Sequence, residues 1–296
     1  MSSPPEVVSK VSEARDRISR AKAAGETIGL VPTMGALHEG HLSLVRRARS
    51  ECGCVIMTIF VNPTQFSPGE DFQRYPRDLA GDVKKAGEAG VDLVFAPPVE
   101  EIYPEGDATV VEVTGALVEG MCAPHRPGHF RGVTTVCARL FSIVGADRAY
   151  FGEKDYQQLQ VIRRMVRDLR FPLAIVPVAT VREADGLAMS SRNAYLTGPE
   201  RKAATVLYRA LTSARAELEG GERSAAALLA TVKVGIGAEP LVKLQYAELR
   251  DAETLAVMDR VERPAVLAVG AFVGKTRLID NVVLRDASVD GYTCEG

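Results

Sequence analysis

The sequence lacks the features that mark several classes of protein. Its 36 basic and 38 acidic side chains give a formal net charge of −2, so nothing indicates a surface for nucleic acid or membranes. No apolar run approaches the roughly 20 residues of a membrane-spanning helix. The first residues show no basic start followed by an apolar stretch, and so predict no secretory signal. We therefore expect a globular protein with no nucleic-acid partner and no membrane association.

The chain also has few residues suited to disulfides or zinc. Its five cysteines are an odd, irregularly spaced set, which favours free thiols over a disulfide framework. Cys52 and Cys54 flank Gly53, and Cys294 lies near the end of the sequence. There are four histidines, and no cysteine lies near His38 and His41 in the sequence, so zinc is not expected there.

That histidine pair lies in the most informative segment, PTMGALHEGH, which runs from Pro32 to His41. An apolar run over 28–31 predicts a buried strand before it, and apolar spacing over 41–50 predicts a helix after it. A helix N-terminus offers free N–H groups to an anion, and glycine allows close backbone approach. His38 and His41 are therefore candidates to bind a nucleotide phosphate. A lone pair of this spacing could also be a helix cap or half of a metal site.

The order of predicted elements indicates the fold. Helices are expected over 5–24, 41–50, 78–89, 132–144 and 155–168, and strands over 28–31, 55–61, 91–95, 148–151 and 173–178. This alternation favours a doubly wound, parallel α/β sheet, in which ligands bind at the carboxyl ends of the strands. After about residue 198, the texture changes to an Ala-rich helical stretch over 199–235, divided by Gly220-Gly221, and three strands over 241–249, 265–273 and 276–284. We predict a domain over 1–182 and a smaller α+β domain over 183–296.

Further candidate site residues follow the predicted strands. Lys154 and Asp155 come after one strand and Asn62 through Gln65 after another, while Ser190, Ser191 and Arg192 follow a glycine turn. Lysine, arginine and hydroxyl groups suit phosphates, and neutral amides suit a hydroxylated carboxylate. A basic loop over 125–132 could bind a carboxylate or cover a site. Asp78 and Asp82, four residues apart on a predicted helix, could hold magnesium. The alternatives are a surface ion pair for Lys154 and Asp155, a capped helix start for Ser190–Arg192, a surface loop for 125–132 and a solvated helix face for the two aspartates.

Four segments in a fixed order carry a family resemblance: PTMGALHEGH, FVNPTQF, FGEKDYQQL and VREADGLAMSSRN. Over about residues 6 to 284 the chain resembles the pantoate–β-alanine ligase family, which belongs to a Rossmann-like, nucleotidyl-transferring superfamily with an HxGH turn. The resemblance implies a cytoplasmic, magnesium- and ATP-dependent homodimer that makes a coenzyme A precursor. In such ligases, pantoate attacks the α-phosphate of ATP to give pantoyl adenylate and pyrophosphate. The amine of β-alanine then attacks the acyl carbon, which releases AMP and pantothenate.

The resemblance also implies roles for individual residues. Residues that would bind the phosphates and stabilise charge are His38, His41, Lys154, Ser190, Ser191 and Arg192. Residues that would line the rest of the ATP site are Pro32, Thr33, Met34, Gly40, Gly152, Asp155, Val181 and Met189. Residues that would bind pantoate or β-alanine are Met34, Asn62, Gln65 and Gln158, with Arg126 and His129 in support. Asp82 would bind magnesium.

Three other functions remain open at this point. A nucleotidyltransferase of the same superfamily would use the same histidines and Lys154, but it gives no reason for the paired amides of Gln65 and Gln158. An aminoacyl-tRNA synthetase is disfavoured, because the chain has no basic excess and no anticodon-binding domain. A non-catalytic nucleotide sensor would not need to keep every charge-stabilising side chain, and it would bind ATP without turnover.

Overall fold

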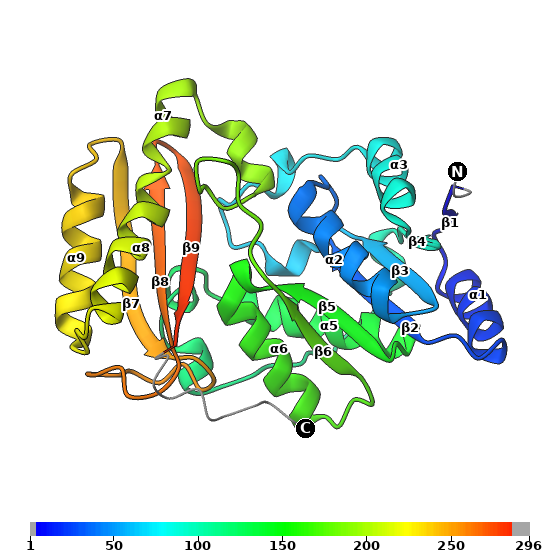
Figure 1. Ribbon diagram of the computed structural model, residues 1–296. Helices are drawn as coiled ribbons and strands as arrows, with labels where there is room; N and C mark the ends of the chain where they lie inside the picture. The colour runs from blue at the N-terminus through cyan, green and yellow to red at the C-terminus, as the bar shows by residue number, and fades with distance from the viewer. Residues whose placement is uncertain (1–3, 286–296) are drawn as a thin grey trace. The chain divides into compact units, whose positions relative to one another are not determined.

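The computed structural model describes residues 4–285, which divide into two compact units (Figure 1). The N-terminal unit comprises Met1–Val113, Arg126–Glu153 and Val161–Val181, and the C-terminal unit comprises Thr114–His125, Lys154–Gln160 and Arg182–Gly296. The boundary between Val181 and Arg182 lies one residue before the expected boundary between 182 and 183. The C-terminal unit also includes Thr114–His125 and Lys154–Gln160, which a single boundary in the chain does not predict. Long-range contacts, and not chain order, decide which residues pack together.

The N-terminal unit is built on a parallel sheet of six strands. These are β1 (Glu6–Val8), β2 (Ile28–Thr33), β3 (Cys54–Ile59), β4 (Leu93–Phe95), β5 (Arg148–Gly152) and β6 (Ala174–Val178), in the order β1-β4-β3-β2-β5-β6. All five strand pairings are parallel, which confirms the predicted fold class. Strands β2 and β3 pair from Ile28 opposite Cys54 to Thr33 opposite Ile59. Their carboxyl ends are therefore level, and the loops that follow them start side by side.

Helices of this unit include α1 (Val11–Ala23), α2 (Glu39–Glu51), α3 (Leu79–Ala89), α4 (Val99–Ile102), α5 (His129–Val144) and α6 (Tyr156–Asp168), the last of which begins in the C-terminal unit. Helix α2 packs with α3, and α1 with α5. A core of Val31, Val45, Met57, Ala86 and Val94 joins α2 and α3 to the sheet. The expected helix over 5–24 was wrong at its start, because Glu6–Val8 pairs with β4 as an edge strand. Helix α5 begins three residues earlier than expected.

The C-terminal unit contains an antiparallel sheet of β7 (Val242–Asp251), β8 (Ala265–Val273) and β9 (Thr276–Leu284), in that order. This confirms the three predicted strands. The helical stretch forms α7 (Gly198–Ala203), α8 (Val206–Glu219) and α9 (Ala225–Gly237), one helix more than Gly220-Gly221 alone indicates. Apolar side chains of the helices and strands share one core, which includes Leu207, Leu211, Leu228, Val232, Leu267 and Val269.

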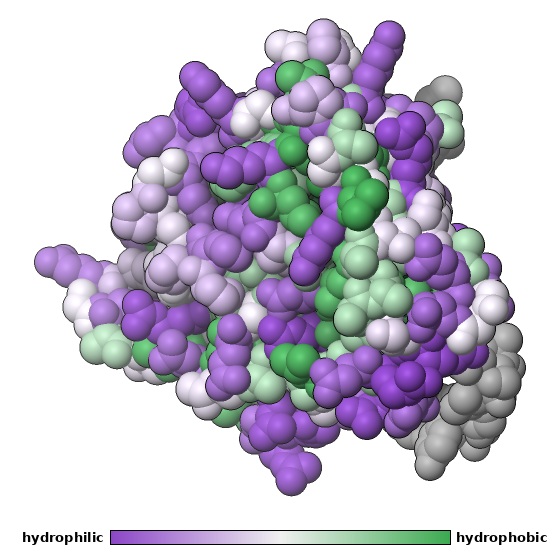
Figure 2. All heavy atoms as spheres, turned by 90° about the vertical axis from the view of Figure 1, so that its left-hand side faces the viewer, coloured by the Kyte–Doolittle hydropathy of each residue, from purple (hydrophilic) through white to green (hydrophobic). Residues whose placement is uncertain are grey.

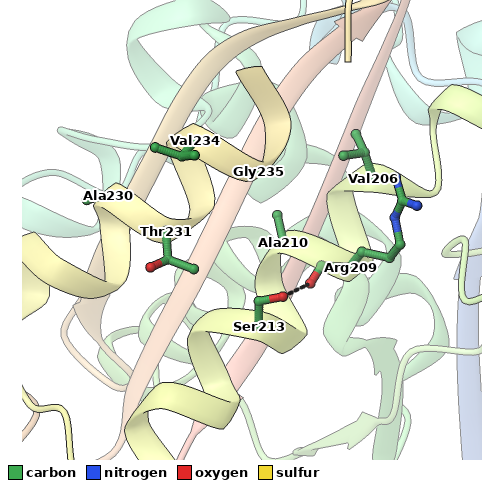
Figure 3. Close-up of a pocket in the computed structure, with 8 residues that line it drawn as sticks. All are labelled: Val206, Arg209, Ala210, Ser213, Ala230, Thr231, Val234 and Gly235. Carbon is green, nitrogen blue, oxygen red and sulfur yellow. Dashed lines mark hydrogen bonds between the residues drawn. The ribbon is translucent and has the colours of Figure 1, made fainter. Parts of the chain in front are cut away.

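A groove of about 610 Å³ lies between α8 and α9 (Figure 3), lined by Val206, Arg209, Ala210, Ser213, Ala230, Thr231, Val234 and Gly235. On this side of the C-terminal unit, apolar surface is broken up by hydrophilic side chains (Figure 2). Val234, one of the groove's apolar residues, is 74% exposed. No candidate site residue lines this groove.

The described cysteines are buried, and none of them forms a disulfide. Cys52, Cys54, Cys122 and Cys137 are buried free thiols, as the spacing predicts, and Cys294 lies outside the described residues. Among residues 4–285, no helix has the length and apolar character needed to cross a membrane.

Candidate functional site

The turn that joins β2 to α2 adopts an unusual backbone conformation. Gly35 has φ +82° and Ala36 has φ +51°, so two consecutive residues occupy the left-handed region. The backbone N–H groups of Ala36 and Leu37 donate to Oδ2 and Oδ1 of Asp82, each at 2.8 Å. A carboxylate that accepts two such bonds can hold a strained turn in place. Asp82 therefore anchors the motif turn from helix α3.

This geometry does not fit the expectation that Asp82 binds magnesium. The residue is 2% exposed, and both carboxylate oxygens accept a backbone N–H. Nor does the described part of the chain contain a group of three His, Cys, Asp or Glu side chains that could hold a metal ion. The sequence pattern could not separate the two roles, because a buried acidic residue at the start of a helix suits either one. We assign Asp82 to the turn.

The role of Asp82 leads to a prediction about Asp82→Asn. An asparagine would point an NH2 group at one of the two N–H donors, so we expect a loss of about 2 kcal/mol in the free energy of unfolding. We also expect kcat/KM to fall about tenfold or more, because the displaced turn misplaces the histidines. Denaturant unfolding and steady-state kinetics would measure both. The control is Asp78→Asn, which alters the N-cap of the same helix. Recovery of activity at raised magnesium concentration would instead identify Asp82 as a metal ligand.

The two histidines cap α2 and are oriented by its first backbone N–H groups. His38 is the N-cap residue, and its Nδ1 accepts the N–H of Gly40 at 3.1 Å. The backbone N–H of His38 donates to Nδ1 of His41 at 3.3 Å, and the two ring centroids are 4.1 Å apart. Because each Nδ1 accepts a hydrogen bond, a neutral ring must carry its proton on Nε2. Each ring can therefore donate an Nε2–H to an oxygen anion at a helix N-terminus, where the dipole favours negative charge.

The loop after β3 brings a second set of candidates together. It contains η1 (Pro63–Gln65), a short 3-10 helix that follows Asn62. Nδ2 of Asn62, a residue only 1% exposed, donates to Oε1 of Gln65 at 3.0 Å and to the carbonyl of Gly132 at 3.2 Å. Nε2 of Gln65 then faces Sδ of Met34 at 3.2 Å. These contacts fix which side of the Gln65 amide is the carbonyl oxygen and which is the NH2 group. The second N–H of that NH2 group can donate to a ligand.

Two residues that the sequence did not single out for this site support Asn62 and Gln65. The hydroxyl of Tyr103 donates to Oδ1 of Asn62 at 2.7 Å. Burial raises the pKa of Tyr103, so the hydroxyl stays protonated and able to donate. Gly132, in α5, lies so close to η1 that a Cβ there would be 2.3 Å from the carbonyl oxygen of Thr64. Tyr103 lies in a loop outside every motif, and nothing in the sequence predicts its role. Gly132 belongs to the basic loop over 125–132, which the sequence did identify as a candidate.

Arg126 and His129 also act on Gln65, but through its backbone. Nδ1 of His129 contacts the carbonyl oxygen of Gln65 at 2.8 Å, and Nη1 of Arg126 contacts Nε2 of His129 at 2.9 Å. A carbonyl only accepts and a guanidinium only donates, so the neutral ring here carries its proton on Nδ1. Arg126 further forms a two-pronged ion pair with Glu70, at 2.7 and 2.8 Å. Burial alone would raise the pKa of Glu70, but the hydrogen bonds from Arg126 leave it lowered.

The C-terminal unit holds the other candidates. Lys154 lies in η5 (Glu153–Asp155), and its Nζ is 4.0 Å from Oδ2 of Asp155. Gln157 is 4% exposed, and its amide bonds Cys122 N–H and the carbonyls of Leu117 and Gly120, each at 2.9 Å. Gln157 is therefore committed to packing, which leaves its half-buried neighbour Gln158 as the glutamine for a ligand.

Ser190 to Arg192 lie at the start of η6 (Ser191–Tyr195). Ser190 is its N-cap, and Oγ accepts the N–H of Arg192 at 3.3 Å. Asn193 ties the segment back to Glu183 at 2.9 Å and to the carbonyl of Ala188 at 3.1 Å. These local bonds keep the two serines and Arg192 together on one short segment.

The structure thus groups the predicted site residues within each unit. Those in the N-terminal unit are Pro32, Thr33, Met34, His38, Gly40, His41, Asn62, Gln65, Arg126, His129, Gly152 and Val181. Those in the C-terminal unit are Lys154, Asp155, Gln158, Met189, Ser190, Ser191 and Arg192. Apart from Arg126 and His129, the N-terminal group lies at or just after the carboxyl ends of β2, β3, β5 and β6, where parallel α/β sheets bind ligands.

A parallel α/β sheet with two oriented histidines at a helix N-terminus defines a protein of the nucleotide-binding α/β class. Residues 6–283 match the model of a family described as pantoate–β-alanine ligase. The pantothenate synthetases of Moorella thermoacetica and Rubrobacter xylanophilus are each 55% identical to this chain, covering 95% of it and 99% of their own length. The chain therefore belongs to the pantoate–β-alanine ligase family, and the resemblance seen in its motifs is confirmed.

Solved structures agree with that assignment. The crystal structure of pantothenate synthetase from Thermus thermophilus matches with a TM-score of 0.91 at 50% identity, over 95% of this chain and 100% of that chain. A pantoate–β-alanine ligase from Francisella tularensis, complexed with β-γ ATP and β-alanine, matches with a TM-score of 0.77 at 32% identity, over 94% and 97% of the two chains.

Proposed function

We propose that this ligase condenses pantoate with β-alanine at the expense of ATP, through a pantoyl adenylate. The observation that carries the proposal is the histidine pair at the N-terminus of α2, because its hydrogen bonds place the proton of each neutral ring on Nε2, an atom that can donate to a phosphate at a helix N-terminus. The ligand-bound relative from Francisella tularensis, complexed with ATP and β-alanine, supports the choice of substrates. We further propose a cytoplasmic homodimer.

In the first step, a carboxylate oxygen of pantoate attacks the α-phosphorus of ATP. A new C–O–P linkage forms, and the bond to the β-phosphate oxygen breaks to release pyrophosphate. Negative charge builds on the phosphate oxygens, and preorganised donors lower the barrier by stabilising it. We assign this role to His38, His41 and Lys154, with the Ser190–Arg192 segment on the β- and γ-phosphates.

In the second step, the amine of β-alanine attacks the acyl carbon of the adenylate. The C–N bond forms as the C–O bond to AMP breaks, and the amine loses a proton. We assign Arg192 to β-alanine, and Gln65 and Gln158 to the hydroxyls and carboxylate of pantoate, with Met34 packed beside Gln65. Asn62 is buried and its amide already bonds Gln65, Gly132 and Tyr103, so we assign it to positioning Gln65 instead of contacting β-alanine. Holding both reactants in place contributes much of the rate, since the step becomes effectively unimolecular.

The remaining assignments concern the nucleotide itself. We assign the ribose and adenine to Gly152, Asp155, Val181 and Met189, with Pro32, Thr33 and Gly40 beside the phosphates. Magnesium is proposed as the counterion of ATP, and no residue is assigned as its ligand because Asp82 is committed to the turn.

The proposal is tested by the release of pyrophosphate and AMP from ATP and magnesium, with pantoate alone and then with β-alanine added. Pyrophosphate release that needs pantoate, with sustained AMP formation only after β-alanine, supports the two-step ligase. Steady pyrophosphate release that ignores β-alanine would favour the nucleotidyltransferase. Tight ATP binding without turnover would favour the sensor.

A further inference from the structure

Strand β9 carries two adjacent polar residues that are buried and that the proposed mechanism does not use. Asp280 is 3% exposed and Asn281 is 6% exposed, in a strand whose other buried residues include Leu278, Val282 and Leu284. Adjacent side chains of a strand point to opposite faces, so the pair can reach two different segments. A buried carboxylate is costly unless it is paired and hydrogen-bonded, which makes its partners informative.

The partner of Asp280 is Arg182, the first residue of the segment that leads to Ser190. Nη1 and Nη2 of Arg182 donate to Oδ2 and Oδ1 of Asp280 at 2.7 and 2.9 Å. The same guanidinium donates to the carbonyl of Gly186 at 3.1 Å and lies 3.8 Å from the ring centroid of Tyr208. Gly186 packs so closely on Tyr208 that a Cβ there would be 2.4 Å from the ring. The Asp280–Arg182 pair thus clamps the turn that precedes Ser190.

The partner of Asn281 is the backbone of Lys154. Nδ2 of Asn281 donates to the carbonyl oxygen of Lys154 at 3.0 Å. Nη2 of Arg182 also donates to the carbonyl of Asn281, at 3.2 Å. Two segments that lie far apart in the sequence are therefore tied to adjacent residues of β9. All of these contacts lie within the C-terminal unit.

We propose that Asp280 and Asn281 are positioning residues for the triphosphate of ATP, which set Lys154 and the Ser190–Arg192 segment in one arrangement. The inference rests on the proposed function, which assigns these two segments to the phosphates. Neither residue contacts ATP itself. Their effect is to hold the phosphate-binding groups in place before ATP arrives, so that binding ATP does not cost the ordering of two loops.

The experiment compares Asp280→Asn and Asn281→Ala with a matched control, Asp251→Asn. Asp251 is also a buried carboxylate of the same sheet, 5% exposed. It accepts the N–H groups of Thr254 at 2.7 Å and Glu253 at 3.0 Å and pairs with Arg263, but it touches no candidate site residue. Thermal unfolding and the KM values for ATP and pantoate are measured for each variant, each KM at saturating concentrations of the other substrates.

We expect both β9 variants to raise the KM for ATP, by at least about tenfold for Asp280→Asn and about threefold for Asn281→Ala, with the KM for pantoate within about twofold of wild type. The control should lower Tm without changing the KM for ATP. If Asp280→Asn does not fold, Asn281→Ala decides the question. A KM for ATP within about twofold of wild type in Asn281→Ala overturns the proposal, as does an equal rise in the control.

The same measurements keep this inference separate from the proposed function. Wild-type protein that does not ligate pantoate to β-alanine would refute the proposed function. Lys154→Ala protein with an unchanged KM for ATP would refute the assignment of Lys154 to the phosphates. Loss of ATP affinity in Lys154→Ala, together with wild-type affinity in the β9 variants, would refute the positioning role alone.

Discussion

Replacement of His38 by alanine is expected to slow pantoyl adenylate formation by about 100-fold or more, equivalent to about 3 kcal/mol in the activation free energy. The neutral ring has its proton on Nε2, because Nδ1 accepts the N–H of Gly40 at 3.1 Å. Alanine removes this donor from the N-terminus of α2, where negative charge develops on the phosphate. Single-turnover release of pyrophosphate from ATP and pantoate measures the step directly.

His38 also caps α2, so the experiment needs a variant that separates the two roles. Alanine at an N-cap costs about 1 kcal/mol in stability, whereas asparagine is a good N-cap residue. His38→Asn should therefore restore the Tm that His38→Ala loses, but not the rate. If His38→Asn restored the rate as well, the side chain would act through the helix cap and not on the phosphate. His125→Ala, at an exposed histidine in the C-terminal unit, controls for loss of an imidazole.

Replacement of Lys154 by alanine is expected to have a comparable effect, about 100-fold or more on adenylate formation, and to raise the KM for ATP. Nζ is 4.0 Å from Oδ2 of Asp155, and that carboxylate is half exposed, so this pair is worth little. The ammonium charge is therefore left to act on a ligand. Removing it takes one positive point charge from the phosphates and leaves the backbone contact from Asn281 to the Lys154 carbonyl in place.

Two further variants sharpen the result for Lys154. Lys154→Arg keeps the positive charge but changes a compact ammonium into a planar fork, so we expect partial recovery of the rate. Lys275→Ala removes an exposed lysine from the turn between β8 and β9 and should leave both the rate and the KM for ATP unchanged. Pyrophosphate release by Lys154→Ala within about fivefold of wild type would contradict the assignment.

Sequence patterns predicted the architecture because the constraints involved are local. An unbroken apolar run such as residues 55–61 indicates a parallel strand buried on both faces, and apolar positions at helical spacing indicate the helices between strands. The sequence did not predict the strand Glu6–Val8, because three residues are too few to show the alternation of apolar and polar side chains that indicates a strand. Pairing with β4, which lies far away in the chain, makes it a strand.

By itself, the sequence determined the fold class, the family and the segments on which the candidate site residues lie. Each of these is read from residues close together in the chain, where spacing alone fixes which side chains share a turn or a face. Only the tertiary structure decided that Asp82 holds the motif turn, that Tyr103 and Gly132 support Asn62 and Gln65, and that Asp280 and Asn281 join two distant segments. These contacts join residues far apart in the chain, and packing of the whole unit decides which buried polar groups find partners.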